Sequence, residues 1–424
     1  MADEFRFDAA GVMGNSIART PNLDRLAAGA VVFDNAYTPS PVCVPGRQCL
    51  ATGRFPRRAG CQHFNEDIAP NSPTFARWFS ERGYYTVACG KLHHRGPDQM
   101  QGWIHRIGAE TAVRWPEAFA SRSQVGRRKW LGAPDVLEAG VGVSPLGLHD
   151  DLTVHGACDF LRAHFGGMYL VPTDVPLFLK VSLQQPHFPL RTEQELFDYY
   201  YDKVPVYENQ PASDNPLLNI GRLDESEGVT TEAIRRATAT YYGMVEKTDH
   251  RIGEVLQTLE ACGQDLDDWV IVFTADHGEM LGEHGLWEKR KFYEGSARVP
   301  MFIRGPGLEA GRNATFVNLV DLYPTLAAQA GLPAPSDIDG RDIFNPDRGA
   351  DETFSQHGED RFMLRTGKWK YIVMEDGSET LFDLAQDPGE LVNAISHPDH
   401  AEIAAQLRAR LATFREEQGK FSFA

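Results

Sequence analysis

The chain has 424 residues, of which 42% are hydrophobic and 24% are charged, and this composition is typical of a globular enzyme with a large core. Its formal net charge of −17 weighs against nucleic acids and anionic membranes as partners, because both would repel it. No apolar run approaches the roughly 18 residues that a membrane span needs. The six cysteines show no CxxC and no metal-knuckle spacing, so we expect a cytoplasmic protein without a disulfide framework.

The predicted elements alternate along the chain between amphipathic helices and short apolar strands. Helical patterns cover residues 20–28, 74–82, 150–164, 231–258 and 319–330. Apolar runs typical of buried strands cover residues 84–88, 176–183, 269–275 and 300–303. Strands that alternate with helices predict an α/β fold with a mostly parallel central sheet covered on both faces.

A loop that turns into a helix comes early, in PVCVPGRQCLATGR at residues 41–54. Its prolines forbid a regular strand but are tolerated in a first helical turn, and Gly53 has the position of a C-cap. A helix that starts near Val44 places Cys43 at its N-terminal end and Arg47 on the same face. A sulfur atom, a guanidinium and the positive end of a helix then meet, which favours an anion site.

The last part of the chain has a different pattern. The polar, Pro/Gly-containing stretch at residues 342–352 is a candidate boundary. We therefore predict a catalytic domain at residues 1–345 and a smaller α+β domain at residues 346–424. The smaller domain is expected to hold an antiparallel meander and an amphipathic helix near the C-terminus. Residues 101–149 and 201–230 look irregular and are predicted to be insertions that set specificity.

Chemically reactive side chains follow the predicted strands. The carboxyl ends of parallel strands meet at one edge of a sheet, so we expect these side chains to share one site with Cys43 and Arg47. Each has an ordinary structural explanation when taken alone: a solvated lysine, a loop histidine, a capped turn or a small buried cysteine. Their joint placement favours a site. The residues are Asp3, Lys91, His93, His187, Asp276 and His277.

The residue types in this group indicate a metal. Two carboxylates, Asp3 and Asp276, with an oxygen ligand near Cys43 would suit a hard divalent cation such as Ca²⁺ or Mg²⁺. A thiolate is a poor ligand for such an ion. This conflict indicates that Cys43 is changed into a group that bears oxygen.

These residues carry a family resemblance. Cys43-x-Pro45-x-Arg47 followed by LATGR resembles the type I sulfatase signature, in which the cysteine is oxidised to Cα-formylglycine. Further similar segments follow in family order, and the resemblance runs from Met1 to about residue 395. GKLHHRGPDQMQGW is similar to the choline-sulfatase-like branch, whereas PHFPL is similar to sulfatases of carbohydrates or aryl esters. The resemblance implies an alkaline-phosphatase-like fold, which is a three-layer α/β sandwich.

The resemblance implies hydrolysis of a sulfate monoester to an alcohol and sulfate, with Ca²⁺, Mg²⁺ or Mn²⁺ and formylglycine as cofactors. Arg47 would orient the formylglycine, Lys91 and His93 would flank it, and His187 and Lys289 would contact the sulfate and the leaving oxygen. Glu4 stands where some members have a second aspartate, and its role as a ligand stays open. The implied metal ligands are Asp3, Cys43 as formylglycine, Asp276 and His277.

Several alternatives stay open at this point. The same scaffold would serve a phosphodiester or phosphonate monoester hydrolase, and a chain with unconverted Cys43 would be a non-catalytic binder. The alcohol is a choline, sugar or aryl group; choline would want an aromatic or acidic cage. The resemblance also implies maturation by a formylglycine-generating enzyme, and dimers or tetramers built from the C-terminal region. Aromatic residues available for a cage in the variable segments are Trp103, Trp115, Tyr199 and Tyr200.

The position of Asp3 departs from the family pattern. In the family this aspartate ends the first, central strand, but here only Met1 and Ala2 precede it. We expect Met1 to be an internal methionine of a longer reading frame; the alternative is a sheet that lacks an inner strand and exposes unpaired edges. An added upstream apolar segment is then predicted to raise metal affinity and stability.

Overall fold

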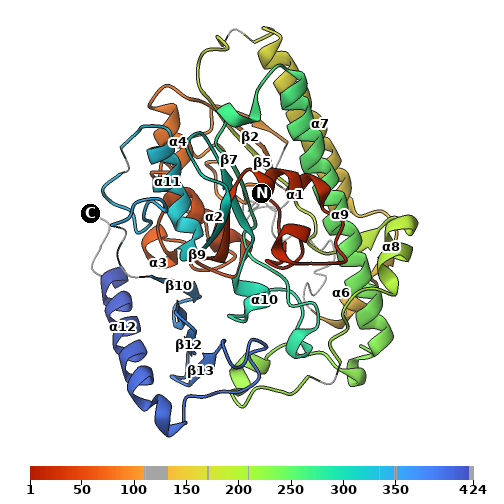
Figure 1. The fold of residues 1–424 in the computed structure, drawn as a ribbon, viewed down its shortest axis with the longest axis vertical. Coiled ribbons are helices and arrows are strands. Elements are labelled where there is room, and N and C mark those ends of the chain that lie inside the picture. The colour runs from red at the N-terminus through yellow and green to blue at the C-terminus, as the bar shows by residue number, and fades with distance from the viewer. Residues whose placement is uncertain are drawn as a thin grey trace.

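The first three residues lie in the middle of the fold, between two sheets (Figure 1). In this computed structural model, residues 1–419 are described except 109, 111–131, 170, 209, 334, 348 and 350. The Met1 amine donates to the Val181 carbonyl oxygen at 2.9 Å, and Ala2 N–H donates to the Thr274 carbonyl oxygen at 3.1 Å. Residues 1–3 therefore carry Asp3 to the edge where both sheets end. The prediction about the start of the reading frame stays a prediction.

The two central sheets are parallel except around one strand. The order of the first is β3-β2-β5, and both of its pairs are parallel. The order of the second is β7-β8-β1-β9, where β8 is antiparallel to both neighbours and β1 is parallel to β9. Their bounds are β1 (Val31–Tyr37), β2 (Tyr85–Gly90), β3 (His105–Ile107), β5 (Leu177–Ser182), β7 (Ile271–Thr274), β8 (Met301–Arg304) and β9 (Gly311–Asn318).

Helices cover the sheets from both sides, as predicted. The long helices α7 (Pro145–Phe165) and α9 (Thr231–Ala261) lie together on one side (Figure 1). Helix α9 buries Ala237, Tyr241 and Val245, which recur at the helical period. Helices on the other side are α2 (Cys43–Thr52), α4 (Phe75–Ser80) and α11 (Leu322–Gln329). Shorter elements are α1 (Pro21–Ala28), α3 (Pro56–Ala59), α6 (Ala133–Leu137), β4 (Gly140–Val141), β6 (Arg191–Thr192), α8 (Gln194–Tyr201) and α10 (Glu294–Ala297).

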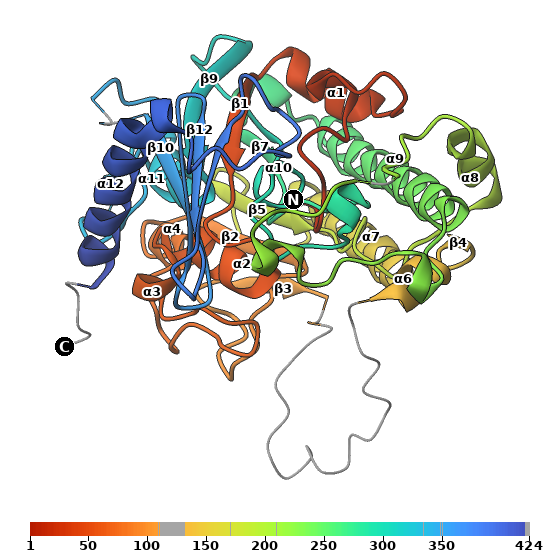
Figure 2. The same ribbon diagram turned by 90° about the horizontal axis from the view of Figure 1, so that it is seen from below.

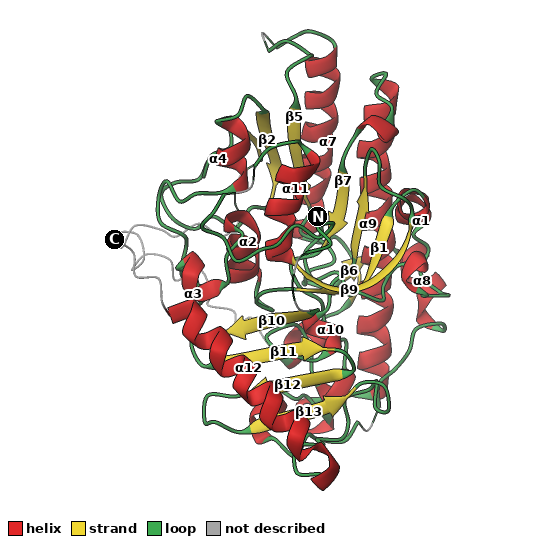
Figure 3. Ribbon diagram, turned by 60° about the vertical axis from the view of Figure 1, so that its left-hand side comes forward, coloured by secondary structure: helices red, strands yellow, loops and turns green. Residues whose placement is uncertain are grey.

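The C-terminal part forms a separate antiparallel sheet, crossed on one face by helix α12 (Ala401–Gly419) (Figures 2 and 3). Helix α12 buries Ala404, Leu407, Leu411 and Phe414, and the Phe414 ring stacks on Phe354 of the sheet with 4.0 Å between ring centroids. The antiparallel meander and the terminal helix are thus confirmed. The strands are β10 (Glu352–His357), β11 (Arg361–Thr366), β12 (Trp369–Val373) and β13 (Glu379–Asp383).

A buried lysine ties the C-terminal sheet to the rest of the protein. The fully buried Lys370 Nζ of β12 lies 2.7 Å from Glu294 Oε1, 2.5 Å from Glu390 Oε1 and 2.8 Å from the Phe292 carbonyl oxygen. Removing one partner leaves uncompensated buried charge. We expect Lys370→Met to lower the free energy of unfolding by about 3–5 kcal/mol in urea titrations.

Lys368 provides the matched control on the same side of the hairpin. Its side chain is 46% exposed and pairs with Asp383 at 2.6 Å. Lys368→Met removes an equal charge and should cost less than about 1 kcal/mol. Equal losses for the two variants would contradict a structural role for the buried lysine.

The sequence analysis located these elements unevenly. All the predicted helices and strands are present, but the short strands β3, β4 and β6 were not predicted, and the stretch 101–149 that was expected to be irregular contains β3, α6 and β4. The longer strands β1 and β9 were not predicted either. The polar residues Asp34 and Asn35 interrupt β1, and exposed residues fill the first half of β9, so neither shows a continuous apolar run. None of the described helices has the length and apolar character to span a membrane. The domain boundary at residue 345 stays a prediction.

Candidate active site

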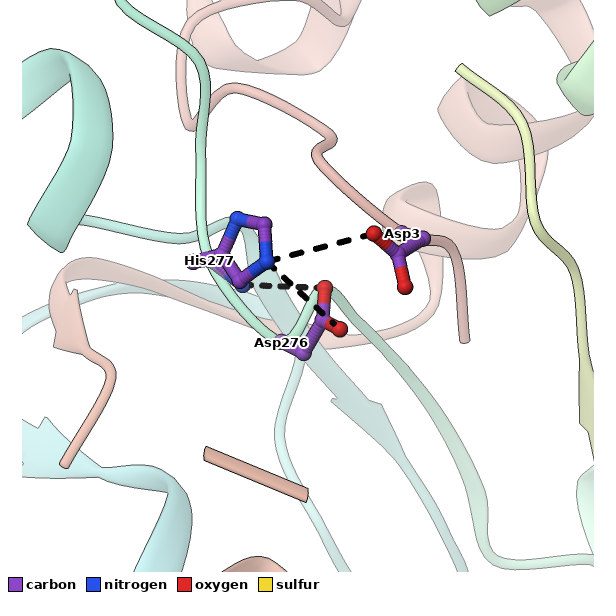
Figure 4. A group of neighbouring side chains, drawn as sticks. All are labelled: Asp3, Asp276 and His277. Carbon is purple, nitrogen blue, oxygen red and sulfur yellow. Dashed lines mark hydrogen bonds and ion pairs between the residues drawn. The ribbon is translucent and has the colours of Figure 1, made fainter. Parts of the chain in front are cut away.

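Three ligand-type side chains meet at the edge where residues 1–3 and β7 end. Asp3, Asp276 and His277 are fully buried, and each offers an atom within 4.8 Å of those of the others (Figure 4). His277 Nε2 lies 3.9 Å from Asp3 Oδ1 and 3.8 Å from Asp276 Oδ2. Within the described part of the chain, Asp3 Oδ1 and His277 Nε2 have no hydrogen-bond partner. Buried atoms of this kind are typical of side chains that bind an ion.

The histidine is held in the tautomer that a metal needs. His277 Nδ1 lies 3.0 Å from the Gly278 carbonyl oxygen, so Nδ1 carries the proton and Nε2 keeps its lone pair. Burial lowers the pKa of His277 to about 4, so the ring is neutral at physiological pH. Two carboxylates and a neutral imidazole form a donor set that fits a divalent cation.

Arg47 bonds to the carboxylates of both Asp3 and Asp276. Its Nε donates to Asp276 Oδ2 at 2.7 Å and its Nη2 to Asp3 Oδ2 at 2.9 Å. Its Nη1 donates to Ser182 Oγ at 2.8 Å and to the Lys91 carbonyl oxygen at 2.9 Å. The guanidinium therefore orients both carboxylates and offsets their charge. The sequence analysis predicted Arg47 in this site but not these partners.

Cys43 begins helix α2 and is buried beside this group. The helix caps at Gly53 with φ 67°, as predicted. A Cβ on Gly46, in the first turn, would lie 2.9 Å from the Ser40 carbonyl oxygen and 3.3 Å from the Asp276 carbonyl oxygen, so a larger residue would force the backbone to shift next to Asp3, Asp276 and His277, called here the metal-type cluster. Burial raises the pKa of the Cys43 thiol to about 11, although Lys289 and Lys91 oppose the shift. The unmodified side chain is thus a neutral thiol.

Lys91 and His93 follow β2 and reach the same cluster. Lys91 Nζ lies 2.5 Å from Asp3 Oδ2, and this carboxylate raises the pKa of Lys91 against the effect of burial. His93 is buried with φ 66°, and burial holds its pKa well below the usual range. Its Nδ1 has no partner among the described residues. Both side chains remain candidates for the roles given to them above.

His187 and Lys289 close the site from two other loops. His187 Nδ1 donates to the Phe188 carbonyl oxygen at 2.6 Å, and its Nε2 accepts from Lys289 Nζ at 2.9 Å. Burial, helped by Lys289, keeps the pKa of His187 well below the usual range. The Glu4 carboxylate raises the pKa of Lys289 despite burial, so the lysine stays an ammonium. A neutral acceptor and a cation thus lie side by side.

Glu4 bonds to Lys289 and lies outside the group of Asp3, Asp276 and His277. It forms a second possible group with Asp3 and His187, whose ligand atoms also lie within 4.8 Å of one another. In this arrangement Glu4 holds Lys289, and its role as a metal ligand stays open.

Two acidic residues that the sequence analysis did not single out hold the loops that carry His93 and His187. Glu110 accepts the Leu92 and His93 backbone N–H groups at 2.7 Å each. Asp150 accepts the Gln184 and Gln185 backbone N–H groups at 2.7 and 2.8 Å, just before His187. Both carboxylates accept hydrogen bonds from the backbone of another segment of the chain. No local sequence motif predicts such a contact.

The aromatic residues that the sequence makes available for a cage, or for ordinary packing, lie elsewhere. Trp103 is buried and packs on Phe75 with 5.7 Å between ring centroids. Tyr200 is buried and donates to Glu246 at 2.8 Å, and the neighbouring Tyr199 ring lies against Arg19. Trp115 lies outside the described residues. The three that are described contribute to packing.

Family models and known relatives match this chain over most of its length. The family model described as Sulfatase matches residues 1–332, and that described as N-sulphoglucosamine sulphohydrolase, C-terminal, matches residues 282–417. A choline-sulfatase of Rhizobium meliloti is 32% identical over 92% of this chain and 81% of its own length. An arylsulfatase of Clostridium perfringens is 31% identical over 99% of this chain and 94% of its own length.

Solved structures share the fold at lower identity. A phosphonate monoester hydrolase of Agrobacterium radiobacter superposes with a TM-score of 0.78 at 23% identity, covering 98% of this chain and 94% of that one. A 2-O GAG sulfatase superposes with a TM-score of 0.74 at 21% identity, covering 99% and 91%. These similarities confirm the predicted alkaline-phosphatase-like fold.

Proposed function

Because this chain belongs to the sulfatase family, we propose that it hydrolyses a sulfate monoester through a formylglycine made from Cys43 and a divalent cation held by Asp3, Asp276 and His277. The observation that carries the proposal is a pair of buried atoms, Asp3 Oδ1 and His277 Nε2, which lie 3.9 Å apart and have no hydrogen-bond partner among the residues that the structure describes. The chain is a sulfatase; the modification and the cation are the proposal.

The donor set supports a hard cation. Carboxylate oxygens and a neutral imidazole suit Ca²⁺, Mg²⁺ or Mn²⁺, and an oxygen at position 43 would complete the set better than sulfur. When bound, the ion and the hydrated formylglycine would supply an acidified hydroxyl as nucleophile and positive charge for the sulfate oxygens. Arg47 keeps both carboxylates aimed at that position.

The remaining residues divide the work on the substrate. Lys289 and Lys91 are buried ammonium groups, and they would bind the sulfate oxygens and stabilise charge that develops on them. Lys289 donates to His187 Nε2, so this pair would deliver a proton to the leaving alcohol oxygen. His93 is neutral, and no described residue bonds to its Nδ1, so it would take the proton whose loss expels sulfate.

A phosphodiester or phosphonate monoester hydrolase is the second candidate. The Agrobacterium radiobacter enzyme of that name shares the fold over 98% of this chain. A tetrahedral phosphonate would meet the same buried cations as a sulfate. The third alternative, a binder with unconverted Cys43, would keep the anion site without turnover.

The relatives support a small sulfated substrate. Their printed names, choline-sulfatase and arylsulfatase, leave a choline, sugar or aryl sulfate as the substrate class that we propose. We also propose maturation by a formylglycine-generating enzyme and assembly of copies through the C-terminal region. All six cysteines are unpaired, which supports a cytoplasmic location.

Parallel turnover of three ester classes tests the reaction. We expect kcat/KM for 4-nitrophenyl sulfate to exceed that for a matched phosphodiester and a matched phosphonate monoester by at least about 10²-fold, because a sulfate monoester presents three terminal oxygens to the buried cations, whereas the two phosphorus esters present two and carry a second organic group. Protein whose Cys43 conversion is confirmed by peptide mass is the sample. Faster cleavage of the phosphodiester or phosphonate would replace the proposal by the second candidate.

A further inference from the structure

A cavity of about 970 Å³ opens beside Lys289, away from the metal-type cluster. Its walls come from segments far apart in the sequence, including the loop after β7 and the C-terminal sheet. Because Lys289 lies on its wall and also contacts His187, this cavity adjoins the place where the leaving alcohol would sit. Wall residues include Arg222, Trp287, Glu288, Lys289, His357 and Arg361.

Glu288 is a wall residue whose carboxylate has no hydrogen-bond partner among the described residues. It is 6% exposed, and both carboxylate oxygens lack a hydrogen-bond partner within the described part of the chain. The neighbouring Trp287 indole nitrogen also lacks one there. A buried carboxylate without a partner is costly, so its retention indicates an external group that offsets it.

The backbone holds Glu288 in an unfavourable conformation. Its φ is 65°, in the left-handed region that non-glycine residues rarely adopt. The carbonyl oxygen of Glu288 accepts from Met280 N–H at 2.9 Å, and its own N–H donates to the Glu279 side chain. The strain and the anchoring together fix where this carboxylate lies on the cavity wall.

The acids next to Glu288 favour a cation as its partner, although Arg222, Arg290, Lys291 and Arg361 also line the cavity. Burial raises the pKa of Glu288 to about 8, the nearby acids Glu279 and Asp135 add to the shift, and Lys289 opposes it. Lys289, however, is bonded to Glu4 and His187. A bound cation would lower the pKa again and ionise the carboxylate.

We propose that Trp287 and Glu288 form a specificity site for a sulfate ester whose alcohol carries an ammonium group. The carboxylate would pair with the ammonium, and the indole would add a cation–π contact. The sulfate would then lie on Lys289 at the adjoining edge. This inference rests on the proposed sulfatase reaction and names the substrate class for that site.

The test compares two esters that differ only in charge. Choline sulfate and its carbon isostere 3,3-dimethylbutyl sulfate are assayed near pH 9, above the Glu288 pKa of about 8. We expect kcat/KM to favour choline sulfate by at least about 30-fold, and Glu288→Gln to lower that ratio by about tenfold or more. Glu288→Asp, which keeps the charge, should restore much of the preference.

The control variant is Glu359→Gln, which removes a carboxylate that is 69% exposed at the rim of the cavity and should leave the ratio within about twofold. Calorimetric binding of choline and of 3,3-dimethylbutan-1-ol to Cys43→Ala protein gives the same comparison without turnover. Failure of the sulfatase reaction is therefore distinguishable from failure of this inference. Equal binding of the two alcohols, or a ratio unmoved in Glu288→Gln, would overturn it.

Discussion

Replacing Cys43 by alanine is expected to lower kcat for sulfate-ester hydrolysis by more than about 10⁴-fold, because the proposed nucleophile is built from this side chain. Since burial raises the thiol pKa to about 11, less than about one unconverted thiol in 10³ is ionised at pH 7. Activity should therefore follow the fraction of formylglycine and not the total protein. Kinetics and peptide mass on the same preparations measure both quantities.

Cys49 is the matched control for this substitution. It lies six residues further along the same helix, is fully buried, and packs in the cluster that joins the C-terminal sheet. Cys49→Ala should cost about 1 kcal/mol of stability and leave kcat within about threefold. If Cys43→Ala keeps more than a few per cent of the activity, the nucleophile lies elsewhere and the proposed reaction is wrong.

Much of the fold was predictable because apolar periodicity reports burial. The strands that were predicted are continuous apolar runs, and Met301–Arg304 is an example with three buried residues in four. Strand β1 was missed because Asp34 and Asn35 break its run. Their side chains lie at the half-buried middle of the strand, where Asp34 pairs with Arg312 and Asn35 donates to the Ala314 carbonyl oxygen. Pairing between distant segments of this kind leaves no periodic signal.

The candidate site was predictable as a set of residues but not as a network. Residue type and strand-end position were enough to group Asp3, Lys91, His187 and Asp276 with Cys43. The supporting contacts were not predictable, because they join main-chain atoms to side chains from far along the chain. Glu110 is an example: it lies 17 residues beyond His93, and its contact depends on the left-handed turn there.

The cation proposed to bind Asp3, Asp276 and His277 makes a second large effect expected. Asp276→Asn should lower kcat by more than about 10³-fold and weaken Ca²⁺ binding by a similar factor, because the variant loses a charged ligand. In the parent, removing the cation with a chelator should abolish turnover, and added Ca²⁺ should restore it. Saturating the site at 100 times the dissociation constant should raise the free energy of unfolding by about 2.7 kcal/mol.

Asp267→Asn is the control, because this carboxylate is 76% exposed and pairs with Arg304 away from the site. It removes the same charge and should leave both the Ca²⁺ affinity and the calcium-dependent rise in melting temperature unchanged. A substitution of Arg47 would change the charge of the site in the opposite direction, because its guanidinium neutralises part of the charge on Asp3 and Asp276. If the chelated parent keeps its turnover, or Asp276→Asn binds Ca²⁺ as tightly as the parent, the orphaned Asp3 and His277 atoms do not mark a cation site. The positive charge that stabilises the sulfate would then have to come from Lys91, Lys289 and Arg47 alone.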